Sequence, residues 1–225
     1  MQEFMVSKGN LSVEAVTTDS KIRIRQIAQV DVKRVVDIHL QAFDGFFLTF
    51  LGPHFLEVFY SATVDDPTGI SLLAYDDQNI YGFVVGTSNP SGFYLRLIKH
   101  KLWKFVITSL QPFFKNPKIL PRLLRALLMP NQAALPDGWG LLMSFGVSNE
   151  VQNKGVGRLL IDAFLEEATQ RGLKRVYLTT DEDNNGKVNA FYNKRGFRCE
   201  KSFITPEGRR MNGYVTDLPV SMAIN

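Results

Sequence analysis

Two glycines one residue apart, Gly155 and Gly157, stand beside a lysine in the stretch N-E-V-Q-N-K-G-V-G-R-L (149–159). An apolar run that suits a buried strand (139–147) precedes this stretch, and a helical pattern (156–171) follows it. The start of a helix leaves backbone N–H groups unpaired and favours an anion, and glycine allows a ligand close to the backbone. The stretch therefore suits a phosphate group, although a structural Gly-x-Gly turn fits the same residues.

Several other chemistries find no support in the sequence. The loop contains no G-K-[ST], which a P-loop requires, and its glycines do not complete a dinucleotide-binding fingerprint. The single cysteine, Cys199, excludes an internal disulfide and a zinc site built from cysteines, and we expect it to be a half-buried strand residue. The three histidines show no ligand spacing, so we expect no metal site.

A second stretch, N-G-K-V-N-A-F-Y-N-K-R-G-F (185–197), begins about 28 residues after Gly157. Together the two stretches resemble the signatures of the Gcn5-related N-acetyltransferase (GNAT) superfamily. The first signature, Q/R-x-x-G-x-G/A, is matched by Gln152, Gly155 and Gly157. The second, Asn-x-x-Ala-x-x-x-Tyr followed by x-Lys-x-Gly-Phe, is matched by Asn185, Tyr192, Lys194, Gly196 and Phe197, with Val188 in place of the alanine.

The resemblance implies a binding site for acetyl-CoA. Its pyrophosphate would lie on backbone N–H groups of Gln152, Asn153, Lys154, Gly155, Val156 and Gly157. The Lys154 and Arg158 side chains would pair with the phosphates or stay solvated. The thioester carbonyl would accept from the N–H of Phe145 or Val147, which stabilises a developing oxyanion. Asn185 would contact the pantetheine arm, cap the helix that follows it, or do both.

The resemblance also implies direct attack by an amine, with Tyr192 as the general acid that protonates the leaving thiolate. The alternative for Tyr192 is a packing role in the core. The general base stays open: Asp181, Glu182 and Asp183, Asp44, and a water relay are the candidates.

Periodicity and turn residues predict an α/β chain. The expected strands are 22–26, 69–75, 80–87, 139–147, 175–180, 197–203 and 210–218, and the expected helices are 32–42, 53–62, 93–110, 119–128, 156–171 and 186–195. The resemblance implies the GNAT fold, a mixed, mostly antiparallel twisted sheet flanked by helices. We expect a loose N-terminal leader (1–20) and one domain (21–222) with a basic helical insertion at about 89–136.

The insertion carries the charge asymmetry of the chain. Residues 89–136 contain eight basic and no acidic residues, whereas the rest contains 18 basic and 22 acidic residues, a net charge of −4. Three interpretations compete: a lid over an acidic acceptor such as a nucleotide-linked sugar, a membrane-surface element, and a homodimer interface. No nucleic-acid recognition motif accompanies the charge.

These features predict an acetyl-CoA-dependent N-acetyltransferase that acts on a small amine. The alternative is a non-catalytic acyl-CoA-binding or membrane-surface module on the same fold. The sequence contains no run of 18 apolar residues, and its N-terminus lacks the pattern of a signal peptide. We therefore expect a cytoplasmic protein.

Overall fold

The computed structural model describes residues 13–14, 22–43, 47–115, 135–151 and 154–219. An eight-stranded sheet in the order β1-β2-β3-β4-β5-β6-β8-β7 forms its centre. The strands are β1 (Val13–Glu14), β2 (Arg23–Gln26), β3 (Gly69–Tyr75), β4 (Ile80–Thr87), β5 (Trp139–Val147), β6 (Arg175–Asp181), β7 (Arg198–Ile204) and β8 (Arg210–Asp217). All neighbouring strands are antiparallel except β5 and β6, which are parallel. The predicted mixed, mostly antiparallel sheet is confirmed.

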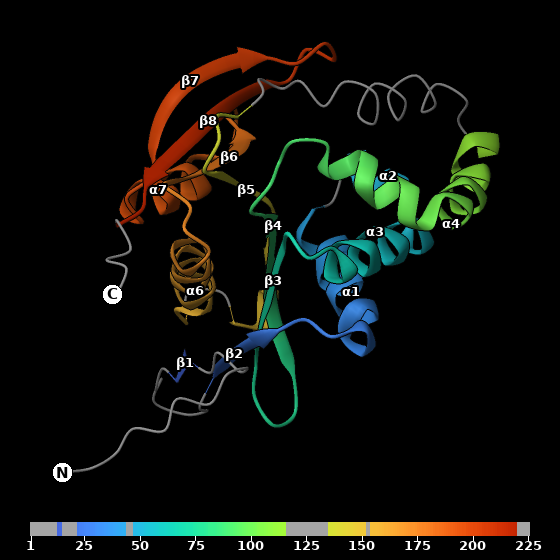
Figure 1. Cartoon of the computed structure of the whole chain (residues 1–225), viewed down its shortest axis with the longest axis horizontal. Helices are drawn as coiled ribbons and strands as arrows, with labels where there is room; N and C mark the ends of the chain where they lie inside the picture. Colours follow the sequence, from blue (N-terminus) through green and yellow to red (C-terminus); the bar gives the residue numbers. More distant parts are fainter. Residues whose placement is uncertain (1–12, 15–21, 44–46, 116–134, 152–153, 220–225) are drawn as a thin grey trace.

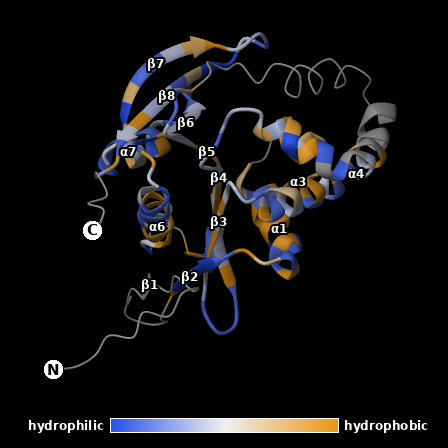
Figure 2. Cartoon of the chain, viewed as in Figure 1, coloured by the Kyte–Doolittle hydropathy of each residue, from blue (hydrophilic) through white to orange (hydrophobic). Residues whose placement is uncertain are grey.

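Helices cover both faces of the sheet (Figure 1). They are α1 (Val32–Ala42), α2 (Phe47–Phe50), α3 (Pro53–Asp65), α4 (Phe93–Lys115), α6 (Val156–Gln170) and α7 (Gly186–Lys194). The α6 helix packs on one face around a core that includes Leu160 and Phe164, and α1 and α3 pack on the other around Val35 and Leu56. The central strands β3 and β4 are therefore apolar over almost their whole length, because both of their faces are covered. Figure 2 shows the apolar sides of α6, α1 and α3 turned towards the sheet.

The pairing of β5 with β6 is short. Only Trp139, Gly140 and Leu141 of β5 pair with β6, although β5 continues to Val147 and β6 to Asp181. We call the space between residues 142–147 of β5 and 178–181 of β6 the β5–β6 opening. It leaves one edge of β5 without a strand partner.

Asp31 ties the start of α1 to the sheet. It occupies the N-cap position of α1, but its side chain makes no cap hydrogen bond to that helix. Its carboxylate accepts from the N–H of Ala28 at 2.8 Å and pairs with Arg25 at 2.6 Å. Arg25 holds the pKa of Asp31 below its usual value. Asp31 thus fastens the beginning of the helix to β2.

The described half of the basic insertion is a single kinked helix. The α4 helix is longer than the predicted 93–110 and bends at Lys101, whose φ is −132° and ψ 29°. Two of its cations are tied to the body of the protein: Arg96 pairs with Asp66 at 3.3 Å and Lys101 with Asp65 at 2.7 Å. The second predicted helix, 119–128, lies outside the described residues.

Two further expectations concern the ends of the sheet. Val13 and Glu14, within the expected leader 1–20, pair with β2, and the rest of that leader lies outside the described residues. Cys199 is a strand residue as predicted, but it is exposed rather than half-buried, because β7 is an edge strand whose side chains mostly face solvent. Within the described ranges, no helix has the length and apolarity needed to cross a membrane.

Gly86 of β4 offers a test of how tightly α6 packs on the sheet. A Cβ atom there would lie 2.3 Å from the carbonyl oxygen of Leu141 and 2.6 Å from the Phe164 ring. We expect Gly86→Ala to lower the free energy of unfolding by about 2 kcal/mol, because neither neighbour can move freely. Urea unfolding followed by circular dichroism measures the effect.

Gly186→Ala is the matched control, because a Cβ atom at Gly186 would meet nothing within 4 Å. It should change the free energy of unfolding by no more than about 0.5 kcal/mol. Equal unfolding midpoints for the two variants would contradict the packing described for Gly86.

Candidate active site

The N-terminus of α6 follows β5 through a tight turn. Gly155 is its N-cap, in the left-handed region with φ +82°, where a side chain would strain the backbone. Val151 and Val156 are buried on either side and anchor the turn in the core. Gln152 and Asn153 lie outside the described residues. A helix start leaves backbone N–H groups without partners inside the helix, so this position suits an anion, and the phosphate site stays a prediction.

The two charged side chains of this turn are at the surface. Lys154 is exposed, and Arg158 makes an ion pair with Asp162 at 3.3 Å with both side chains well exposed. Asp162 also pairs with Arg195 at 3.4 Å. Because exposed pairs of this kind contribute little to stability, Arg158 can leave Asp162 for a phosphate at small cost.

The two separate motif stretches meet at one point. A Cβ atom on Gly157 would lie 3.1 Å from the Phe145 ring, so any side chain there would require the ring to shift away from the first turn of α6. Phe145 in turn stacks on Phe191 of α7, with ring centroids 5.6 Å apart and planes 11° apart. Phe145 therefore joins the glycine loop, β5 and the second signature.

The backbone of β5 presents N–H groups to the β5–β6 opening. The N–H of Ser148 donates to the backbone carbonyl of Tyr81 at 2.7 Å, and Val147 lies opposite Gly82 in β4. Because N–H directions alternate along a strand, Phe145 and Val147 direct theirs to the opposite edge. That edge faces β6 beyond the last residues that pair with it. These are the two N–H groups named from the sequence.

Tyr192 lies in an aromatic cluster beside this edge. It is 5% exposed, and its ring lies 5.5 Å from those of Phe191 and Phe197 and 6.4 Å from that of Phe145. Burial raises the pKa of its hydroxyl above the usual value of 10.0. The phenol therefore keeps its proton at neutral pH. The position satisfies the packing interpretation, and the role of Tyr192 as a general acid stays a prediction.

Asn185 fastens the start of α7 to the end of β6. It occupies the N-cap position of α7, but its side chain makes no cap hydrogen bond. Its amide donates to the Thr180 hydroxyl at 2.6 Å and to the Asp181 carbonyl at 3.1 Å. The Asn189 amide donates to the same carbonyl at 3.2 Å. The Asn185 side chain therefore does not supply the predicted cap to α7, because its amide group is held at the end of β6.

The acidic residues considered as general bases are paired with arginines. Both carboxylate oxygens of Asp181 accept from Arg209 at 2.7 Å. Glu182 pairs with Arg210 at 2.8 Å, and Asp183 lies 3.9 Å from the same guanidinium. Asp44 lies outside the described residues. The paired carboxylates connect β6 to the β7–β8 hairpin, so they hold that hairpin in place.

A buried polar group on the opposite face of β5 escaped the sequence analysis. His39 of α1, Tyr60 of α3 and Ser144 of β5 are each at most 5% exposed. The Nδ1 atom of His39 lies 2.7 Å from the Tyr60 hydroxyl. Burial lowers the pKa of His39 to about 4, so its imidazole is neutral at pH 7. A histidine inside the predicted apolar stripe of 32–42 was the signal that could have revealed it.

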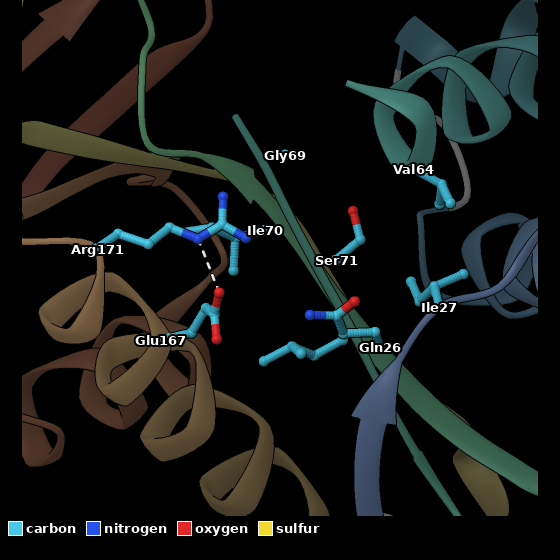
Figure 3. A pocket seen from close by; sticks show the side chains of 9 residues that line it. Gln26, Ile27, Val64, Gly69, Ile70, Ser71, Glu167 and Arg171 are labelled. Atoms are coloured by element: carbon cyan, nitrogen blue, oxygen red, sulfur yellow. Dashed lines mark hydrogen bonds and ion pairs between the residues drawn. The ribbon is translucent and has the colours of Figure 1, made fainter. Parts of the chain in front are cut away.

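A cavity of about 50 Å³ lies at a different place in the fold. Figure 3 shows the side chains that line it. Its lining includes Gln26 and Ser71 of β2 and β3, and Glu167, which pairs with Arg171 at 2.7 Å on α6. No residue of either signature lines this cavity. It lies apart from the β5–β6 opening.

Comparison with known proteins agrees with this geometry. A model of the acetyltransferase (GNAT) family matches residues 33–197. A stretch of 54 residues is 37% identical to the uncharacterized protein YxbD of Bacillus subtilis. The matched stretch covers 24% of this chain and 33% of that protein. The chain thus spans about a third of that relative's length in the match.

Two solved structures show the same fold at low sequence identity. Ard1 from Thermoplasma volcanium is 14% identical, with 88% of this chain and 98% of that chain covered and a TM-score of 0.57. The PaiA N-acetyltransferase from Thermoplasma acidophilum, solved in complex with coenzyme A, is 12% identical, with 87% and 98% covered and a TM-score of 0.52. With the family model spanning most of the chain, the glycine loop, the divided β5–β6 pair and the buried tyrosine identify this protein as a member of the acetyltransferase (GNAT) family.

Proposed function

We propose that this protein transfers an acetyl group from acetyl-CoA to the amine of a small acceptor. The proposal is supported by three features around β5: the N-terminus of α6 at Gly155, the N–H groups of Phe145 and Val147 directed away from β4, and the buried Tyr192, whose ring centroid lies 6.4 Å from that of Phe145. These features supply an anion site, an oxyanion site and an acid. Acyl transfer from a phosphate-bearing thioester needs all three.

The proposed reaction is a direct displacement. The amine nitrogen attacks the thioester carbonyl carbon, and the carbonyl oxygen gains negative charge that the N–H of Phe145 or Val147 stabilises. The carbon–sulfur bond then breaks, and Tyr192 gives its proton to the sulfur. Tyr192 regains a proton from water. Because burial raises the pKa of this phenol, it is fully protonated before each turnover.

The bound donor would lie along residues from both signatures. Backbone N–H groups of Gln152, Asn153, Lys154, Gly155, Val156 and Gly157 would hold the pyrophosphate, with Lys154 and Arg158 at its charged edge. Asn185 would meet the pantetheine arm close to the end of β6. The Val156 side chain itself is buried in the core, so only its backbone is offered to the ligand.

The proton lost by the attacking amine needs an acceptor. Asp181 and Glu182 are each paired with an arginine, so their carboxylate oxygens are already occupied. We therefore propose that the amine enters in its neutral form and releases its proton to water.

A second role, contact with a membrane surface, is favoured by the outer side of α4. Trp103 and Ile107 are 78% and 63% exposed one helical turn apart, and Lys99 and Lys104 beside them are exposed too. Exposed aromatic and aliphatic side chains flanked by lysines suit an anionic lipid surface. In Figure 1, α4 extends to the outside of the layer formed by α1 and α3. The cations of α4 fit an acidic acceptor such as a nucleotide-linked sugar less well, because two of them, Arg96 and Lys101, are already paired with aspartates.

The general acid can be tested by removing one hydroxyl. The purified protein is incubated with acetyl-CoA and a panel of amines, including polyamines, amino sugars and nucleotide-linked amino sugars, and free thiol is measured. With the best acceptor, Tyr192→Phe should lower kcat about a hundredfold while the KM for acetyl-CoA stays within about twofold.

Tyr214→Phe is the control, because Tyr214 belongs to the same aromatic cluster and its ring centroid lies 6.0 Å from that of Tyr192. It should keep the wild-type kcat. Equal loss in both variants would mean that the cluster, and no particular hydroxyl, matters. If acetyl-CoA binds but no amine yields thiol, the protein is a non-catalytic acyl-CoA-binding module.

The phosphate cradle can be tested with two glycines in the same backbone conformation. Gly155 has φ +82° and Gly208 φ +83°, and a Cβ atom on either would meet nothing within 4 Å. Each change to alanine should lower the free energy of unfolding by about 1 kcal/mol through the same strain. Only Gly155→Ala should also weaken acetyl-CoA binding, by about tenfold in titration calorimetry. Unchanged affinity in that variant would remove α6 from the site.

The membrane contact can be tested by co-sedimentation with vesicles. The protein should bind vesicles that contain phosphatidylglycerol, bind pure phosphatidylcholine poorly, and dissociate as salt is raised. Ile107→Ser and Trp103→Ser should each weaken binding about tenfold, because each removes apolar area that the vesicle surface would bury. Ile204→Ser is the control, since Ile204 is 70% exposed on the distant strand β7. Binding that is the same for both lipids, or self-association through α4 instead, would contradict the proposal.

A further inference from the structure

A small cavity lies at the edge of the sheet, where β2 ends beside β3. The last pair between these strands is Gln26 with Leu72, and the Ile27 N–H then donates to the Ser71 carbonyl at 2.9 Å. Among the residues that the structure describes, 69–70 of β3 have no partner in β2. The cavity beside them has a volume of about 50 Å³. At about 10–15 Å³ for each water-sized group, it can hold roughly three or four non-hydrogen atoms.

The walls of this cavity differ in character. Figure 3 shows side chains of α6 on one side of it, Ile27 and Val64 on the other, and Ser71 between them. The polar lining residues are Gln26, Ser71, Glu167 and Arg171, and the large apolar ones are Ile27, Val64, Ile70 and Leu72. Water would satisfy the polar groups but would leave the apolar wall hydrated, which is unfavourable. An occupant with one polar and one apolar part therefore suits the cavity better.

The two charged groups of the lining neutralise each other. The Nε atom of Arg171 donates to Glu167 at 2.7 Å, and its Nη1 atom donates to the Pro67 carbonyl at 3.3 Å. The Glu167 side chain is 12% exposed and that of Arg171 25%. A carboxylate and a guanidinium each form several hydrogen bonds, so the pair can still accept and donate one more. Because the pair has no net charge, a neutral occupant avoids the dehydration cost that an ion would meet.

The Ser71 hydroxyl is a further polar group of the lining. Its oxygen is buried and, within the described ranges, forms no hydrogen bond. A hydroxyl both donates and accepts, and a buried one without a partner is rare in folded proteins. Since Ser71 lines the cavity, rotation about its Cα–Cβ bond can bring the oxygen towards an occupant. An occupant would thus supply the partner that this hydroxyl lacks.

We propose that this cavity binds the acetamide group of a small N-acetylated molecule. The group is neutral, has a methyl group, a carbonyl acceptor and an N–H donor, and is of the size that the cavity allows. Its carbonyl oxygen accepts from Arg171 and Ser71, and its N–H donates to Glu167. Its methyl group packs on Ile27 and Val64, where it is removed from water.

The proposed site is open on one side. Gln26 is exposed, so the rest of the ligand leaves the cavity beside it. The cavity is separate from the β5–β6 opening, and its binding of an acetamide group does not depend on the proposed acetyl transfer. That reaction makes a molecule with the same group, so its product is one source of the ligand.

The test titrates ¹⁵N-labelled protein with small probes and follows its amide signals by NMR. N-methylacetamide carries the proposed group, whereas N,N-dimethylacetamide lacks the N–H, acetate is an anion and methylammonium is a cation. N-methylacetamide should shift the signals of Gly69, Ile70 and Ser71 until they saturate, with a Kd in the millimolar range. The other probes should bind at least about tenfold more weakly, because each lacks the donor or brings a charge.

Substitutions test the roles of the polar groups. Ser71→Ala removes the hydroxyl and should weaken the binding of N-methylacetamide about fivefold. Glu167→Gln keeps the shape but leaves Arg171 without its anion, so acetate should then bind more tightly than N-methylacetamide. Glu166→Gln is the matched control, because Glu166 is exposed on the same helix and does not line the cavity. It should leave every affinity within about twofold.

Several results would overturn the proposal. Signals that move alike with every probe, without saturation, would mean that the cavity holds only water. Unchanged affinity in both Ser71→Ala and Glu167→Gln would contradict the proposed contacts, and Ser71→Ala decides alone if Glu167→Gln does not fold.

The place of the shifts separates this inference from the proposed function. Shifts confined to Phe145 and Val147 would place the probe at the β5–β6 opening, in agreement with the proposed function and against this inference. Saturable shifts at residues 69–71 in a protein that transfers no acetyl group would support this inference and leave the proposed function wrong.

Discussion

The short parallel pairing of β5 with β6 is the constraint on which the site depends. Three residues of β5 pair with β6, and the two strands then separate. If β5 were paired along its whole length, its N–H groups would donate to carbonyls of β6 and could not bind a ligand. Because the strands separate, Phe145 and Val147 keep their N–H groups directed at the opening. The α6 helix starts a few residues later, so its N-terminus, which the proposed function assigns to the pyrophosphate, follows closely along the chain.

Aromatic rings packed against one another and against a glycine hold the rest of the site around that edge. Gly157 lets α6 approach the Phe145 ring, and Phe145 stacks on Phe191. Tyr192 is buried in the same aromatic cluster. Because aromatic rings bury a large area and prefer definite geometries, the cluster fixes the helix start, β5 and α7 as one unit. The energetic cost of dehydrating Tyr192 keeps its phenol protonated, which the proposed acid role requires.

The helical layer on the other face contributes polar contacts in addition to apolar packing. His39 and Tyr60 are buried as a hydrogen-bonded pair, and a buried polar group without a partner costs far more than a satisfied one gains. The arrangement of these groups is therefore strongly specified. A neutral His39 also avoids the cost of a buried charge, since burial lowers its pKa to about 4.

The sequence by itself determined the elements and the family resemblance. Local patterns carry that information: alternation predicted the strands, and the Gly155 and Gly157 pair with the Asn185 to Phe197 stretch carried the two signatures. Gly172 and Gly196 lie just past the ends of α6 and α7 with positive φ. Periodicity also placed α1, α3, α6 and α7 within a few residues. These features depend on neighbours in the chain, so a single sequence contains them.

Only the tertiary structure decided which groups meet. The Asn185 amide donates to β6, and the Asp181 carboxylate pairs with Arg209. Neither partner can be read from the residues next to them in the sequence. The pairing of His39 with Tyr60, 21 residues apart, depends on how α1 and α3 pack against β5. Burial also changes the chemistry of Tyr192, which its sequence motif cannot state. Partners, burial and proton affinity arise from long-range packing, and that packing turns the two signatures into a site.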